Sequence, residues 1–291
     1  MTEHSTFEQN IIFFLRELEG GNKSRLTLTA YKTDLSQFFN WLAENDVTVT
    51  IPGQVTRGHV NEYLAFLSSL GRSGVTRARK LAALKSFFAY LKDEHIIASS
   101  PAETIHMPNK ERKRKVVLRT DEYSRMLSEA GGNPRDFAIL QLFLQTGIRV
   151  SALIAITLED LDLQNRVLKV HGKGNKERDI PLEKKSVQAL KSWLSLRPES
   201  QDRHLFLNYS GEGLSIRGVR KIVDKYLRKA GITKQISCHG LRRTFGSAKA
   251  GKGMNAFQLQ KLMGHERITT TIEYVEIGQE ELRRAMEATS L

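Results

Sequence analysis

Cysteine is almost absent from this sequence, and its scarcity excludes two common ways of stabilising a domain. Cys238 is the single cysteine among 291 residues, so no internal disulfide can form, and neither can a structural zinc site built on several thiolates. Long apolar runs are missing too, because none approaches the roughly 18 residues that span a bilayer. We therefore expect no membrane partner. The polar residues 1–4, without a basic and then apolar segment, favour a cytoplasmic protein.

Glycine and proline are also sparse, with 21 and 6 residues, while hydrophobic residues make up 40% of the chain. This balance argues against collagen-like, low-complexity and disordered classes. The length suffices for about two domains, each with its own core. The sequence therefore indicates an ordinary globular protein.

Acidic residues are too few to balance the basic ones, since 32 Asp and Glu face 45 Lys and Arg, for a net charge of +13. Residues 1–107 contain 11 basic and 11 acidic side chains, so residues 108–291 carry the whole excess. Lys and Arg that neutralise phosphates release counterions, so a nucleic acid partner is the plain interpretation. Solubility is the alternative, and charge alone decides little between the two.

Four apolar stripes with helical spacing fill the neutral first part, over residues 7–18, 31–42, 60–70 and 75–91. The last of these helices has a basic beginning. We predict that its cations contact DNA phosphates, with a solvated basic face as the alternative. These residues are Arg72, Arg77, Arg79 and Lys80.

A proline-flanked, strongly basic segment follows, and residues 110–115 alone have a net charge of +4. We predict an interdomain linker over residues 108–118, between a first domain at 1–107 and a second at 119–291. Its predicted DNA contacts are Lys113, Arg114 and Lys115.

The second domain is predicted to be mostly helical, with its first helix capped by Thr120. The one β signal is a pair of short strands, residues 167–170 and 180–182, joined by a glycine-rich turn. The predicted fold class is therefore mainly α, or α+β, with a small β-hairpin.

Five short motifs follow one another in the second domain. They are Thr146-Gly147-Ile148-Arg149-Val150-Ser151, Gly172-Lys173-Gly174-Asn175-Lys176-Glu177-Arg178, His239-Gly240-Leu241-Arg242-Arg243-Thr244-Phe245, Leu262-Met263-Gly264-His265 and Tyr274. Together they resemble the tyrosine recombinase (phage integrase) family, and Xer-type recombinases in particular. The resemblance covers the whole chain. It implies a four-helix, SAM-like core-binding domain followed by a mostly helical catalytic domain.

The chemistry of such an enzyme requires cations at the scissile phosphate. A phosphodiester under attack gains negative charge on its equatorial oxygens, and a planar guanidinium can hold two of them. We predict that Arg149 and Arg242 form this clamp. By resemblance, Lys173 in the glycine-rich turn is the general acid for the 5′-hydroxyl, with Lys176 as the competing candidate. The further predicted DNA contacts are Lys176, Arg178 and Arg243.

Two histidines and a tyrosine complete the predicted site. His239 precedes Arg242 by three residues, which puts both on one face of a helix. The resemblance makes His239 a proton acceptor or donor near the nucleophile, His265 a hydrogen-bond partner of the phosphate, and Tyr274 the nucleophile. The other tyrosines that we considered are interpreted as packing or surface residues: Tyr123, Tyr209 and Tyr226.

We expect neither metal nor cofactor. Cys238 lies beside His239, but one thiol and two histidines lack a fourth convincing ligand, and the resemblance implies metal-free chemistry.

The implied activity is site-specific exchange of DNA strands through a covalent 3′-phosphotyrosyl intermediate and a Holliday junction. Its implied partners are duplex DNA with an inverted-repeat site and a homotetramer with one dimer per site, alone or with a second recombinase. The biological role stays open between dimer resolution, transposon cointegrate resolution and integration. By resemblance, the tail at residues 276–291 inserts into a neighbouring protomer. A DNA-binding regulator and a type IB topoisomerase-like enzyme are the alternatives.

Two positions depart from the family pattern. Ala152 stands where many relatives have a glutamate that steadies the first arginine, and Glu159 or Asp160 is a candidate to replace it. Arg243 stands where many relatives have histidine. Neither change removes a primary catalytic group, so we expect activity.

Overall fold

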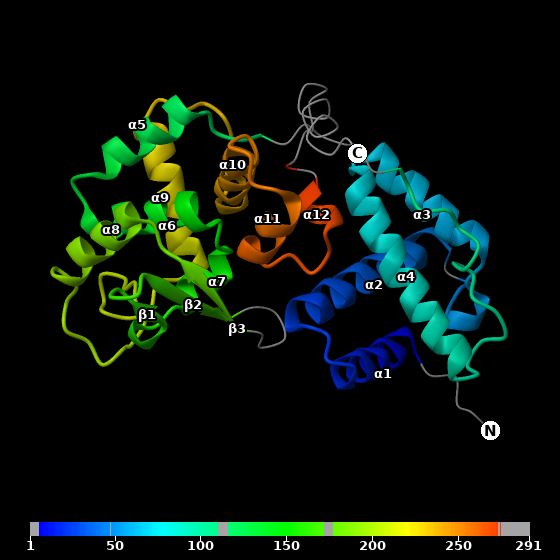
Figure 1. Ribbon diagram of the computed structural model, residues 1–291. Coiled ribbons are helices and arrows are strands. Elements are labelled where there is room, and N and C mark those ends of the chain that lie inside the picture. The colour runs from blue at the N-terminus through cyan, green and yellow to red at the C-terminus, as the bar shows by residue number, and fades with distance from the viewer. Residues whose placement is uncertain (1–5, 47, 110–115, 172–176, 273, 275–291) are drawn as a thin grey trace, which may run out of the picture. The chain divides into compact units, whose positions relative to one another are not determined.

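The computed structural model in Figure 1 describes residues 6–46, 48–109, 116–171, 177–272 and 274. The chain divides into two compact units, Met1–Lys113 and Arg114–Leu291, which we call the N-terminal unit and the C-terminal unit. The predicted central part of the linker, residues 110–115, lies outside the described residues, so the domain boundaries stay a prediction. Leu118, at the predicted end of the linker, is buried in the core of the C-terminal unit.

Four long helices form the N-terminal unit, as their apolar spacing predicts. They are α1 (Phe7–Gly20), α2 (Arg25–Asn45), α3 (Arg57–Ser69) and α4 (Gly74–Asp93), with the 3-10 helix η1 (Pro52–Gln54) between α2 and α3. Each long helix starts at a Ser or Thr whose side-chain oxygen accepts an amide N–H of the first turn, which satisfies a backbone donor that the helix leaves unpaired. The four caps are Thr6, Ser24, Thr56 and Ser73.

Aromatic rings dominate the core of this unit. Phe38 is fully buried, and its ring lies 5.1 Å from that of Tyr63, edge to face. Phe87 meets Phe14 in the same way at 5.5 Å. Such pairs join α1, α2, α3 and α4 and add to the free energy gained by burying their area.

Helices also dominate the C-terminal unit, which confirms the predicted fold class. They are α5 (Thr120–Ala130), α6 (Pro134–Thr146), α7 (Val150–Ala155), η2 (Leu158–Asp160), α8 (Lys184–Leu194), α9 (Ile216–Lys229), α10 (Cys238–Ala250), α11 (Ala256–Met263) and α12 (Thr269–Ile272). The buried helix α6 packs against α5, α8 and α10. Thr120 is the first residue of α5 rather than its cap, because Glu122 accepts the amide N–H of Arg119 in the capping position.

A small antiparallel sheet lies beside these helices (Figure 1), in the order β1 (Leu161–Asp162), β2 (Val167–His171) and β3 (Glu177–Pro181). The sequence predicts β2 and β3 as a hairpin but misses β1, which has too few residues for a recognisable alternation. In the hairpin register, His171 pairs with Glu177. Residues 172–176, which join these two positions, lie outside the described residues.

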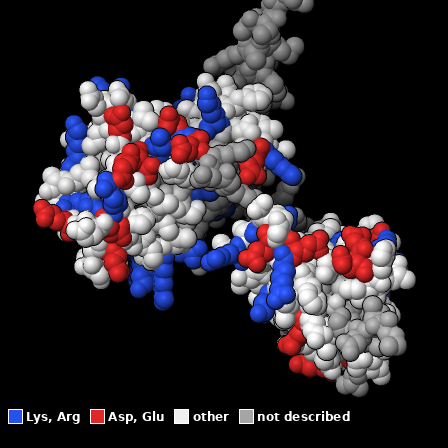
Figure 2. Space-filling view, turned by 90° about the horizontal axis from the view of Figure 1, so that it is seen from below, with Lys and Arg blue, Asp and Glu red and all other residues white. Residues whose placement is uncertain are grey.

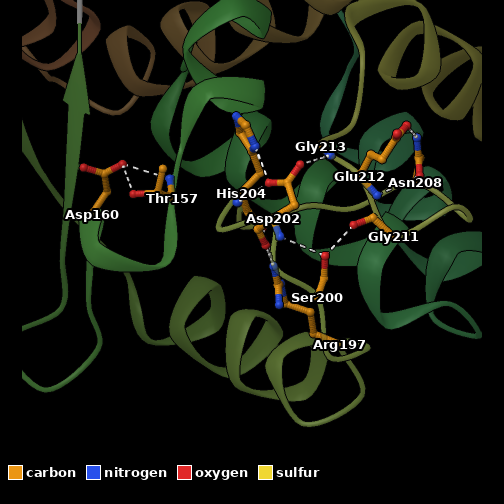
Figure 3. Close-up of polar contacts among 10 residues, drawn as sticks. All are labelled: Thr157, Asp160, Arg197, Ser200, Asp202, His204, Asn208, Gly211, Glu212 and Gly213. Carbon is orange, nitrogen blue, oxygen red and sulfur yellow. Dashed lines mark hydrogen bonds and ion pairs between the residues drawn. The ribbon is translucent and has the colours of Figure 1, made fainter.

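The loop between α8 and α9 is held together by Asp202 (Figure 3). Its carboxylate accepts the amide N–H of Gly213 at 2.7 Å and contacts the ring Nδ1 of His204 at 2.5 Å. Hydrogen bonds with His204 and Gly213 lower the pKa of Asp202 to about 2. The loop also accepts the amide N–H of Leu158 on the carbonyl of Arg203, so it braces the segment that follows α7.

Within the described ranges, no helix is long and apolar enough to cross a membrane.

Candidate active site and DNA-binding residues

Helix α10 presents the predicted His239 and Arg242 one turn apart. His239 is exposed in the first turn, whereas Arg242 is only 1% exposed. The Arg242 guanidinium donates to the carbonyl oxygens of Gly147 at 2.5 Å and of Met263 at 2.8 Å. Burial, followed by the nearby Arg149, lowers the pKa of Arg242 to about 9, so it stays a cation at neutral pH.

Arg149 lies close to Arg242 and follows a turn whose backbone conformation requires glycine. Gly147 ends α6 with φ +59°, and a Cβ on it would collide with the ring of Phe245. Arg149 follows at the start of α7 and donates from Nη2 to the carbonyl of Gly264 at 3.1 Å. Its side chain is exposed, which leaves donors for a substrate.

His265 is buried directly after Gly264, which ends α11 with φ +65°. Its ring Nδ1 lies 2.8 Å from the hydroxyl oxygen of Thr271. Burial, followed by the charge of Arg242, lowers the pKa of His265 to about 4. The imidazole is therefore neutral at physiological pH, and its Nε2 can form a hydrogen bond with a phosphate.

Tyr274 packs beside these groups. Its ring is 8% exposed, lies 6.1 Å from the ring of His265 in a stacked orientation, and covers Gly246 of α10. Burial raises the pKa of Tyr274, and Arg242 is the largest influence that opposes this rise. The phenol is thus protonated at neutral pH and needs a proton acceptor before it can attack.

Arg178 is the third arginine of the site. Its half-buried guanidinium lies against Gly264, where any Cβ would overlap it. Burial and the charge of Arg149 lower its pKa. Among the described residues, its Nε and Nη2 are buried without a hydrogen-bond partner, so their hydrogen-bonding capacity is unused. Arg243 is half-buried on α10, and its charge also lowers the pKa of Tyr274.

A cleft of about 810 Å³ opens at these residues. Its lining comprises Arg149, Ser151, Ala152, His171, Glu177, Arg178, Gly264, His265, Glu266, Arg267 and Thr270. No cluster of three or more potential metal-ligating side chains occurs in the part of the chain that the structure describes.

Several predicted residues lie outside the described ranges. These are Lys113, Arg114, Lys115, Lys173 and Lys176. The strands β2 and β3 end on either side of Lys173 and Lys176, and both strand ends contribute to the cleft.

The carboxylates proposed to replace the missing glutamate at position 152 have other partners. Glu159 pairs with Arg203, and Asp160 accepts from Thr157 and contacts His171. Within the described contacts, Arg149 is held by a main-chain carbonyl instead. His171 is a cleft residue that sequence reasoning missed, because only the strand register and η2 bring it to its partners.

The predicted DNA contacts in the N-terminal unit need one correction. Arg72 is exposed, Arg77 is half-buried, and Arg79 is exposed but paired with Asp34. Lys80 is only 5% exposed, and its ammonium donates to Asp34 at 3.0 Å and to Gln37 at 2.5 Å. A buried, paired ammonium cannot reach a phosphate, so Lys80 holds α4 to α2 instead.

The tyrosines set aside from the sequence lie as expected. Tyr226 is buried and donates its hydroxyl to Asp136, Tyr209 is 90% exposed, and Tyr123 is partly buried.

The fold and the site together define a DNA strand-exchange enzyme of the tyrosine type. The chain belongs to the phage integrase family: the family's own model matches residues 116–281, and the model of its N-terminal SAM-like domain matches residues 11–95. It is a site-specific recombinase that cleaves and rejoins DNA.

Individual relatives agree with this assignment. The chain is 36% identical to tyrosine recombinase XerC of Thermodesulfovibrio yellowstonii over 97% of this chain and 95% of that protein. It is 32% identical to tyrosine recombinase XerD of Listeria innocua over 88% and 90%. Among solved structures, the Tn1549 transposon integrase in complex with transposon right end DNA matches with a TM-score of 0.82 at 22% identity, over 99% and 100% of the two chains.

Proposed function

We propose that this recombinase exchanges strands through a covalent 3′-phosphotyrosyl intermediate, with Tyr274 as the nucleophile. One observation carries this proposal: the phenol of Tyr274, the neutral His265 and the anchored Arg242 lie together between α10 and the C-terminal end of α11. Arg149 and Arg178 line the adjoining cleft together with His265. Three guanidinium groups beside a tyrosine suit a phosphodiester that gains charge during attack.

The chemical step is a transesterification, in which one phosphate ester bond replaces another. The Tyr274 oxygen attacks phosphorus, the bond from phosphorus to the 5′ oxygen breaks, and the phenolic proton passes to His239. Lys173 gives a proton to the leaving 5′ oxygen. In the second step a 5′-hydroxyl of the partner strand attacks the phosphotyrosine, so no energy cofactor is consumed.

The arginines and His265 have different electrostatic roles. Arg149 and Arg242 hold the non-bridging oxygens, and His265 adds a hydrogen bond without adding charge, because its pKa is about 4. Arg178 and Arg243 contribute further positive potential at Tyr274 or at the cleft. The pKa of Arg242, about 9, keeps the clamp charged through the physiological range.

Duplex DNA with an inverted-repeat site is the proposed substrate, bound in the cytoplasm by two protomers per site and four per synapse. The net charge of +13 supports a polyanion partner, and the similar transposon integrase was solved with DNA. Charges are mixed on the face seen in Figure 2, where red side chains lie among the blue ones. Binding therefore depends on particular cations, for which we propose Arg72, Arg77, Arg79, Lys113, Arg114, Lys115 and Lys176.

We further propose that the tail docks on a neighbouring protomer. A cleft of about 850 Å³ opens between α5, α6, α8 and α10 and carries Lys185, Lys252 and Lys249, the last of which pairs with Glu183 of the same cleft. Residues 276–291 contain four Glu and two Arg together with Leu282 and Met286, so their charge and apolar side chains suit this cleft. Truncation after Gly278 should leave single-site binding intact and abolish four-protomer synapses in native gels. If truncated protein still forms such synapses, the tail belongs to its own subunit.

Covalent trapping tests the chemistry directly. Genomic fragments that become attached to the protein identify the site, and a nicked duplex with that site is then incubated with protein in excess chelator. Wild-type protein should form a detergent-resistant adduct, and Tyr274→Phe should bind DNA without forming one. Tyr226→Phe is the matched control, because that buried tyrosine lies outside the site. An adduct that survives in Tyr274→Phe, or that requires a divalent metal, refutes the mechanism.

A further inference from the structure

His171 occupies a position between two carboxylates at the rim of the phosphate cleft. It is the last residue of β2 and lines the cleft together with Arg149 and Arg178. Its ring Nε2 lies 3.1 Å from Oδ1 of Asp160, and its Nδ1 lies 3.5 Å from Oε1 of Glu177. Only the imidazolium carries a proton on both nitrogens, so this arrangement suits the charged ring.

Hydrogen bonds hold the Asp160 carboxylate in place. Its other carboxylate oxygen accepts the amide N–H and the hydroxyl of Thr157, at 2.8 and 2.9 Å. Burial is the largest influence on the pKa of Asp160 and raises it, but the hydrogen bonds from Thr157 and His171 together lower it. Asp160 is therefore an anion at neutral pH, only 9% exposed.

Glu177 lines the cleft, and Asp160 lies behind it in contact with His171, so both anions oppose the binding of a phosphate there. Glu177 also faces Lys169, at 3.7 Å, so it has a second cation within reach. For Asp160, His171 is the ion-pair partner within the described contacts, at 3.1 Å. Loss of this ring would leave Asp160 without an ion-pair partner among the described residues and Glu177 with Lys169, at 3.7 Å.

We propose that His171 promotes the binding of site DNA, because it pairs with Asp160 and Glu177 next to the cleft and ties η2 to the ends of β2 and β3. The inference rests on the proposed function. In this role His171 holds the ends of β2 and β3, which are next to Lys173 in the sequence. It also offsets the negative potential of Asp160 and Glu177 at the cleft.

The charge argument predicts a pattern that loss of packing would not produce. His171→Gln should raise the Kd for site DNA and the KM for adduct formation about 3- to 10-fold at low salt, with a smaller change in the rate at saturating DNA. The defect should shrink in 0.5 M salt. His171→Gln combined with Glu177→Gln should return towards wild type, because one of the uncompensated anions is then removed.

A second histidine of the same unit offers a matched control. His204 contacts Asp202 at 2.5 Å in the loop between α8 and α9 (Figure 3), and it is not among the residues that line the cleft. His204→Gln removes a comparable histidine–carboxylate contact, so it should leave the KM for adduct formation unchanged. Thermal unfolding of both variants reports any loss of stability.

The outcomes separate this inference from the proposed function. If wild-type protein forms no adduct, the proposed function fails. If wild type forms an adduct and His171→Gln matches it in KM and Kd, the inference is wrong. It is equally wrong if the defect is independent of salt, or if Glu177→Gln gives no restoration, since His171 would then act only through folding.

Discussion

Replacing Arg242 by lysine separates the geometry of the clamp from its charge. The guanidinium spans two carbonyl oxygens, those of Gly147 and Met263. A lysine ammonium has its donors on one nitrogen and cannot hold both carbonyls and a phosphate. A buried carbonyl that loses its donor costs about 1–3 kcal/mol. We therefore expect Arg242→Lys to lower the unfolding free energy of the C-terminal unit by about that amount.

The loss in catalysis should be larger than the loss in stability. Removing a preorganised donor from a developing oxyanion typically slows reactions about 10²–10³-fold. Arg242→Lys should slow single-turnover adduct formation by that factor at saturating DNA, measured well below the melting temperature of the variant. Arg228→Lys is the matched control, because Arg228 lies exposed on α9. A variant with less than a fivefold defect would refute the assignment of Arg242 as a phosphate clamp.

Four further outcomes concern stability, DNA binding and the leaving group. The pKa of His265 is about 4 in the folded state and 6.5 ordinarily, so the unfolded state binds more protons between these values. Stability should therefore fall by roughly 2–3 kcal/mol as pH drops from 6.5 to 4, and His265→Gln should flatten that profile in denaturant titrations. Lys80→Met should destabilise the N-terminal unit by about 2–4 kcal/mol because Asp34 loses a buried partner, without changing the salt dependence of DNA binding. Arg72→Ala should instead leave stability unchanged and reduce that salt slope. Lys173→Ala should slow cleavage of an ordinary 5′ ester about 10²–10⁴-fold, and far less for a bridging 5′-thiol, which leaves without a proton.

The spacing of apolar residues predicts both the helices of the N-terminal unit and the burial of one of its basic residues. The apolar spacing predicts all four long helices of the N-terminal unit. It also indicates that Lys80 is buried and so does not contact DNA. Lys80 lies four and seven residues before the buried Leu84 and Phe87, so it shares their face of the helix. Asp34 lies in the buried stripe of α2 in the same way, four residues before Phe38. A buried cation and a buried anion on two stripes indicate a pair, but only the packing shows that these two meet.

The candidate site was predictable where motif and helix geometry coincide. The spacing of His239 and Arg242 places both on one side of α10, and the resemblance supplies Arg149, His265 and Tyr274. The groups that hold these side chains could not be predicted from the sequence. A motif does not show which main-chain carbonyls accept hydrogen bonds, and the contact of His171 with Asp160 depends on η2 and on the register of β2.

The partners of the arginines explain why the site keeps its positive charge. Arg149 and Arg242 donate to the carbonyls of Gly264, Gly147 and Met263, which are dipoles that orient a guanidinium without neutralising it. A carboxylate in the same role would hold the side chain and cancel the charge that a phosphate needs. Burial is the largest cause of the lowered pKa values of Arg242, Arg178 and His265, and repulsion from the neighbouring cations is the second. A phosphate bound here would relieve this repulsion. With alanine at position 152, the backbone positions the proposed clamp and leaves its charge available to DNA.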